Sequence, residues 1–165
     1  METTDFVQLG EFCARLHLAD REARYVLERG FVPAGVAKSP CTGNRRQFDP
    51  LQLLWLAIVV KLRQCGIKTS QAAEIAHFGI NALKAERDRG QIKADQKCYL
   101  DVADQQYGRL RTVAARSDRG AQPVPWCAIR GDRKVPVDFQ PIVVLQIDLS
   151  EIARLLRANP STAGR

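Results

Sequence analysis

The segment "DPLQLLWLAIVVKL" constrains the fold of this chain more than any other. Its first residue, Asp49, is a good helix N-cap, and Pro50 suits the first helical position, where an N–H would have no intrahelical partner. The apolar run is shorter than the roughly 20 residues that a bilayer span needs, and a glutamine and a lysine interrupt it. We therefore expect a buried helix from Pro50 to Cys65 that ends at Gly66, and no membrane partner.

Two shorter helices are expected before this one. Apolar residues recur at helical spacing from Leu9 to Leu16, and Asp20 is placed to cap a second helix over roughly 21–29, ended by Gly30. Two short helices joined by about four residues have the spacing of a helix-turn-helix, in which the second helix projects its first residues outward. Here those residues are Arg21, Arg24 and Tyr25.

The next segment, "FVPAGVAKSPCTGNRRQF", is typical of two extended pieces around a loop rich in Pro, Gly and Ser. Its return strand carries Arg45 and Arg46, as the wing of a winged helix would. Positive charge is concentrated in this part of the chain. Residues 15–46 hold seven basic side chains, Arg15, Arg21, Arg24, Arg29, Lys38, Arg45 and Arg46, against three acids, Asp20, Glu22 and Glu28.

The second half changes in character. A fourth helix is expected from residue 69 or 70, with a break before a continuation to Arg89. Beyond it, β-rich runs predict strands over 97–104, 107–115, 124–129, 133–139 and 141–148. Residues 104–107 and 131–132 are hairpin candidates. Asp148 is placed to cap a final helix that docks on the sheet and leads into a loose tail.

These patterns predict an α+β protein with two domains. Residues 1–89 would form a winged helix-turn-helix, and residues 90–165 a small β-rich domain with a C-terminal helix and a disordered tail, used for dimerisation, effector binding or another interaction.

The net charge and the cysteines indicate which kind of partner and which redox environment the chain is suited to. A formal net charge of +7 favours a polyanionic partner, because each Lys or Arg placed at a phosphate releases a condensed counterion. The five cysteines are scattered without a C-x-x-C pair, which is typical of reduced structural thiols. The first residues lack the pattern of an export signal, so we expect a cytoplasmic, nucleoid-associated protein.

From about Phe6 to Phe78 the chain resembles the MerR family of winged helix-turn-helix transcription regulators. The matching pieces are "LGEFCARL" for the first helix, "ARYVLERGFVPA" for an Arg-Tyr helix followed by Gly, "NRRQFDPLQLLWL" for the wing return, and "LRQCGIKTSQAAEI" for the next helix junction. Asn44 departs from the pattern, since an aromatic residue is common there.

The resemblance implies that the second helix enters the major groove while the wing grips the backbone. By position, Arg24 and Tyr25 match the family's Arg-Tyr pair, Arg46 matches the wing arginine, and Arg21 begins the recognition helix. An arginine on the groove floor can bond guanine, and one at the rim holds a phosphate. The predicted DNA-binding residues are Arg21, Arg24, Tyr25, Lys38, Arg45 and Arg46.

One departure concerns the dimer. Members of the family follow this domain with a long helix that forms an antiparallel coiled coil with its twin. The corresponding segment here, "GINALKAERDRGQIKADQK", shows no sustained heptad. Dimerisation would then fall to the C-terminal domain, and promoter untwisting of the family's kind is not implied.

We therefore predict a sequence-specific regulator that binds double-stranded DNA, as a homodimer because one short helix contacts too few base pairs. No catalytic residue, metal or cofactor is predicted, and a small-molecule effector stays possible. The alternative is an architectural or phage-type DNA factor, such as an excisionase or a small terminase subunit. A nuclease that uses dispersed carboxylates is a third hypothesis, and a thiolate sensor built from Cys98 and Cys127 is weighed against simple packing.

Overall fold

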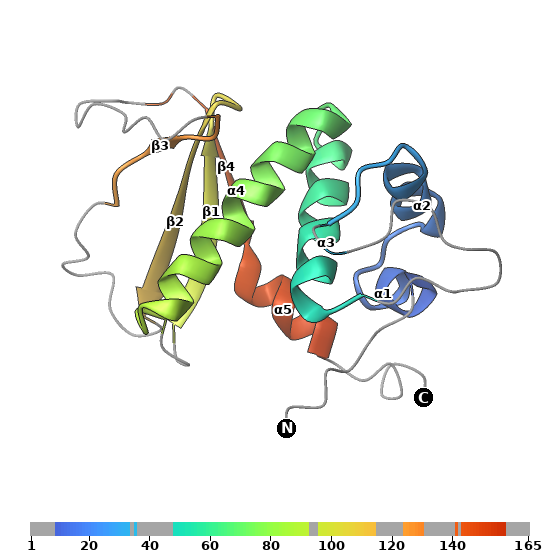
Figure 1. The fold of residues 1–165 in the computed structure, drawn as a ribbon, viewed down its shortest axis with the longest axis horizontal. Coiled ribbons are helices and arrows are strands. Elements are labelled where there is room, and N and C mark those ends of the chain that lie inside the picture. The colour runs from blue at the N-terminus through green and yellow to red at the C-terminus, as the bar shows by residue number, and fades with distance from the viewer. Residues whose placement is uncertain are drawn as a thin grey trace. The chain divides into compact units, whose positions relative to one another are not determined.

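The computed structural model describes residues 9–33, 35, 48–92, 96–114, 124–130, 141 and 143–157. In these residues the chain is α+β, as predicted. The element order is α1 (Leu9–Arg15), α2 (Asp20–Glu28), α3 (Pro50–Gln64), α4 (Thr69–Asp88), β1 (Gln96–Ala103), β2 (Tyr107–Ala114), β3 (Cys127–Ala128), β4 (Val144–Asp148) and α5 (Leu149–Arg157) (Figure 1).

The chain divides into two compact units, Met1–Ala73 with Glu151–Arg165, and Glu74–Ser150. Their boundary falls within α4. The predicted division into a winged helix-turn-helix domain over residues 1–89 and a β-rich domain over residues 90–165 stays a prediction.

The first unit is organised around α3. Asp49 caps this helix as predicted: its carboxylate accepts a bond from the Gln52 N–H at 2.8 Å, and the Gln52 side chain accepts one from the Asp49 N–H at 2.9 Å. This reciprocal pair is a capping box, which satisfies two N–H groups that would otherwise lack partners. The helix is apolar nearly all round, and its residues 53–60 are all buried. Burial on every side is what such a helix requires.

The ends of α2 and α3 share one geometry. Gly30 has φ of 81° and Gly66 has φ of 85°, and in each case the next residue donates its N–H to a carbonyl five residues back. These bonds form the Schellman motif, whose left-handed position favours glycine. The predicted helix ends at these two glycines are confirmed.

The start of α2 differs from the prediction. The N-cap is Ala19, which makes no side-chain capping bond, and Asp20 is the first helical residue. The Asp20 carboxylate instead lies 3.7 Å from Arg24 and hydrogen-bonds the Cys13 thiol. An acid in the first turn still stabilises the helix through the helix dipole.

The helix α5 meets the expectation in part, since its residue Ser150 accepts a bond from the Cys98 N–H of β1 at 2.7 Å. It is amphipathic as predicted, with Leu149, Ile152 and Leu156 buried. From Glu151 onward, however, it belongs to the first unit rather than to the unit of the sheet. There Arg15 donates a hydrogen bond to the Leu156 carbonyl, which has no intrahelical partner at a helix end.

The second unit contains an antiparallel sheet with the order β3-β2-β1-β4. The hairpin predicted between the first two strands is confirmed: Asp104 and Gln105 have φ of 47° and 58°, and Gln106 donates its N–H to Ala103 at 3.0 Å. Two successive positive φ angles are typical of a type I′ turn. The strand predicted over 133–139 and the hairpin at 131–132 lie outside the described residues.

One face of this sheet packs against α4, which crosses it in Figure 1. A Cβ placed on Gly79 would lie 2.7 Å from the Leu100 side chain, and one on Gly108 would lie 2.5 Å from the Phe78 ring. Glycine is therefore needed on both sides of this contact. The break predicted in α4 is wrong, because the helix runs unbroken through Gly79 to Asp88.

Candidate nucleic-acid interface

The candidate interface is the outer face of α2, and the sequence of that helix sets it apart from the buried face. Ala23, Val26 and Leu27 are buried at 0 to 2% exposure. At helical spacing, the opposite face then carries Arg21, Arg24 and Tyr25, which are all exposed. The helix thus brings three of the predicted site residues together on one surface.

The turn that precedes α2 is held by backbone bonds. Leu18 donates its N–H to the Cys13 carbonyl at 2.8 Å, and His17 adopts a left-handed φ of 51°. Below the turn, Phe12 and Leu16 are buried. The path from α1 into α2 is therefore fixed by the backbone and by the core together. His17 acts as a turn residue.

Arg24 is an exposed cation of this face that makes one weak ion pair. Its side chain is 64% exposed and lies 3.7 Å from the Asp20 carboxylate, four residues earlier. An exposed pair of this kind contributes little stability and is screened by salt. Arg24 can therefore exchange this partner for a phosphate or a base edge at small cost.

Tyr25 contacts two arginines. The guanidinium carbon of Arg29 is 5.2 Å from the centre of its ring, and that of Arg63, on α3, is 4.3 Å away. Arg63 is also bound to Glu22 of α2 at 2.8 Å. The ring is thus oriented by two cation–π contacts, and 38% of Tyr25 stays exposed.

Arg63 was not predicted as part of this site. It lies 41 residues after Glu22, and only the packing of α3 against α2 brings them together. The sequence offers one weak signal, a basic residue in the last turn of a helix. That position is ordinary for a basic residue, because it complements the helix dipole.

Lys38, Arg45 and Arg46 lie outside the described residues. Phe48, which follows them, is fully buried and anchors the chain just before α3 begins.

The thiols divide into buried and exposed groups. Burial raises the pKa of the Cys13 thiol to about 12, aided by the hydrogen bond to Asp20 and by its charge. Burial raises the pKa of Cys98 to about 11, with contributions from the charges of Asp148 and Glu86. Cys65 is exposed and Cys127 half-buried. Among the described residues, no group of three or more His, Cys, Asp or Glu side chains could hold a metal ion.

These pKa values predict selective alkylation. At pH 8 in the native protein, the exposed Cys65 should react with iodoacetamide faster than the buried Cys13 and Cys98, because pKa values of about 12 and about 11 leave at most about one of these thiols in a thousand as thiolate. Peptide mass spectrometry after timed quenching measures the three rates. The same reaction in denaturant is the control, in which the rates should converge; equal rates in the native protein would contradict the buried thiols.

Comparison with known proteins does not assign this chain to a family. No protein-family model matches the chain, and no curated protein sequence matches it. Within the described residues, none of the helices is both long and apolar enough to cross a membrane.

Proposed function

We propose that this chain binds double-stranded DNA and regulates transcription, with α2 as the recognition helix of a winged helix-turn-helix of the MerR kind. The observation that carries the proposal is the outer face of α2, where Arg21, Arg24 and Tyr25 are exposed beside Arg63. Four residues separate α1 from α2, as in a helix-turn-helix.

The chemistry of this face suits a duplex. A guanidinium can donate two parallel bonds to guanine O6 and N7 or to a phosphate, and it keeps its charge at every physiological pH. Tyr25, held by cation–π contacts with two arginines, can donate its hydroxyl to a phosphate with little loss of side-chain entropy. Lys38, Arg45 and Arg46 of the proposed wing would add backbone contacts.

The proposed assembly is a homodimer. One helix that contacts three or four base pairs gives too little selectivity, and two-fold symmetry doubles the site. Dimerisation is assigned to the C-terminal half, where a small-molecule effector could also act.

One specific observation favours the alternative function, that of an architectural or phage-type DNA factor. The face of α4 that holds Phe78 and Gly79 packs on Leu100 and Gly108 of its own sheet, so it does not serve as the coiled-coil arm that MerR regulators use. A factor that bends DNA for recombination or packaging needs no such arm. A strong bend at an attachment or packaging site would favour this alternative, whereas a promoter footprint with altered transcription would favour the regulator.

Arg24→Ala tests the proposal. After the preferred duplex is selected from a random pool, this substitution should weaken binding by about 1 to 3 kcal/mol and reduce discrimination between sequences if Arg24 contacts a base. If Arg24 holds a phosphate, all duplexes should weaken alike and the salt slope should fall by about one. Fluorescence anisotropy at several salt concentrations measures both.

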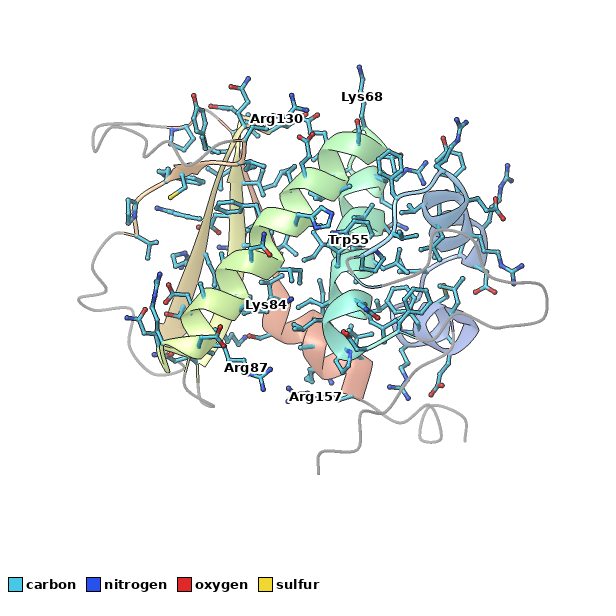
Figure 2. The ribbon with its side chains drawn as sticks, viewed as in Figure 1. Trp55, Lys68, Lys84, Arg87, Arg130 and Arg157 are labelled. Atoms are coloured by element: carbon cyan, nitrogen blue, oxygen red, sulfur yellow. The ribbon has the colours of Figure 1, made fainter. Side chains whose placement is uncertain are left out.

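The matched control is Arg87→Ala, which removes an exposed arginine from α4 in the other unit (Figure 2). It should leave duplex binding nearly unchanged. Equal losses from the two substitutions would show that only general charge matters, and unchanged binding by Arg24→Ala would remove α2 as the recognition helix.

A further inference from the structure

A second cationic cluster lies in the other unit, on the face of the sheet that α4 does not cover. Side chains alternate between the two faces of a strand. Because Leu100 points to α4, its neighbours Tyr99 and Asp101 point the opposite way. The register places Arg109 and Gln146 directly across from Asp101 on the two adjacent strands.

Asp101 is the centre of this cluster and is only 1% exposed. One carboxylate oxygen, Oδ2, accepts a bond from Arg109 Nε at 3.0 Å and another from Arg111 Nε at 3.2 Å. The other oxygen, Oδ1, accepts from the Gln146 amide at 3.2 Å. The carboxylate is therefore satisfied on both oxygens.

Each of the two guanidinium groups also lies over an aromatic ring. Arg109 lies over the ring of Trp126 at 4.3 Å, and Arg111 lies over the ring of Tyr99 at 5.1 Å. Each arginine is thus fixed by an ion pair through Nε and by a cation–π contact on its flat face. Because both guanidinium groups are already held in place, a ligand that binds them has to order less side-chain motion, and the entropic cost of binding is lower.

The charges of the cluster do not balance. Among the described residues, two guanidinium groups donate to one carboxylate and Gln146 is neutral, so one positive charge is left over. The arginine side chains are 24% and 30% exposed, so this excess is only partly solvated. A like-charged pair this close is stabilised by an anion.

The donors needed for an anion are also present. Arg109 uses one further N–H on the Val124 carbonyl at 3.4 Å. Within the described part of the chain, Arg111 makes no hydrogen bond besides the one through Nε. Its terminal N–H groups form the fork that matches two oxygens of a phosphate.

We infer that Arg109 and Arg111, held on Asp101, form a binding site for a phosphate group in the unit of the sheet. The inference does not rest on DNA binding by α2. The phosphate can come from a free phosphorylated molecule or from a nucleic-acid backbone, because both present the same oxygens and charge.

The test is a titration of the full chain with inorganic phosphate at constant ionic strength, followed through the arginine Nε–H resonances. Saturable shifts are expected at Arg109 and Arg111. Arg111→Gln should weaken phosphate binding tenfold or more. Arg111→Lys keeps the charge but lacks the two parallel donors of a guanidinium, so it should also bind phosphate more weakly. This second variant keeps the test valid if Arg111→Gln does not fold.

The matched control is Arg130→Gln in the same unit, whose guanidinium is bound to the Glu74 carboxylate at 2.6 and 2.9 Å. It should leave phosphate binding unchanged. A second arm adds duplex DNA: displacement of phosphate identifies the backbone as its source, and a duplex that binds without moving these resonances identifies a free ligand.

Two results would overturn the inference. One is the absence of a saturable shift with both phosphate and duplex. The other is an equal response to acetate, which would make the cluster a carboxylate site.

Discussion

Replacing Asp101 with alanine is expected to lower the free energy of unfolding of the sheet unit by about 3 to 5 kcal/mol, the range for breaking a buried ion pair from one side. The loss is large because the carboxylate serves three donors at once, from Arg109, Arg111 and Gln146. Without it, the two guanidinium groups lose the carboxylate that both of them bind.

Urea denaturation followed by circular dichroism and tryptophan fluorescence measures this loss, since Trp126 lies against Arg109 and reports on the cluster. Asp88→Ala is the control: it removes an exposed carboxylate at the end of α4 and should change stability by no more than about 0.5 kcal/mol. The double variant Asp101→Ala with Arg111→Ala should recover part of the loss, because the repulsion is relieved. Equal stabilities of the Asp101 and Asp88 variants would show that the buried carboxylate does not hold the sheet together.

Gly108→Val is expected to destabilise the same unit by about 3 kcal/mol, at the upper end of the cost of overpacking. The first added carbon alone would lie 2.5 Å from Cε1 and 2.9 Å from Cδ1 of Phe78. Valine is otherwise the better strand residue, so strand propensity by itself predicts the opposite sign. A loss of stability therefore isolates the steric contact.

The same denaturation experiment with Gly108→Val and Phe78→Leu combined should regain stability relative to Gly108→Val, because the smaller side chain makes room. Gly10→Ala is the control elsewhere, since a Cβ there meets nothing within 4 Å and α1 should gain about 0.5 to 1 kcal/mol from the removal of a helical glycine. If Gly108→Val proves neutral, α4 does not press on the sheet at this point.

Helix ends were predictable because their causes are local. Asp49, Gly30 and Gly66 act on atoms within five residues of themselves, so the sequence pattern contains the whole reason for each end. Asp20 shows the limit of this logic. Its type suits a cap, but its carboxylate pairs instead with Arg24, four residues later, and with the Cys13 thiol, a partner outside α2 that the pattern of this helix does not reveal.

The parts that the sequence did not predict depend on pairing over long distances. The exposed face of α2 follows from helical periodicity, whereas the contact of Arg63 with Tyr25 depends on how α3 packs against α2. The cluster around Asp101 needs the register of three strands, which fixes Arg109 and Gln146 as its neighbours. The carboxylates of this half appeared dispersed because alternation alone does not say which residues meet.

The turn at 104–106 has a consequence for how this unit folds. A β-hairpin closes in about 1 to 10 μs, and these three residues join two strands paired without offset over eight positions. Shortening the turn by one residue would slide β2 by one place and send its arginines to the opposite surface. The backbone angles of Asp104 and Gln105 thus fix on which side of the hairpin the positive charge resides.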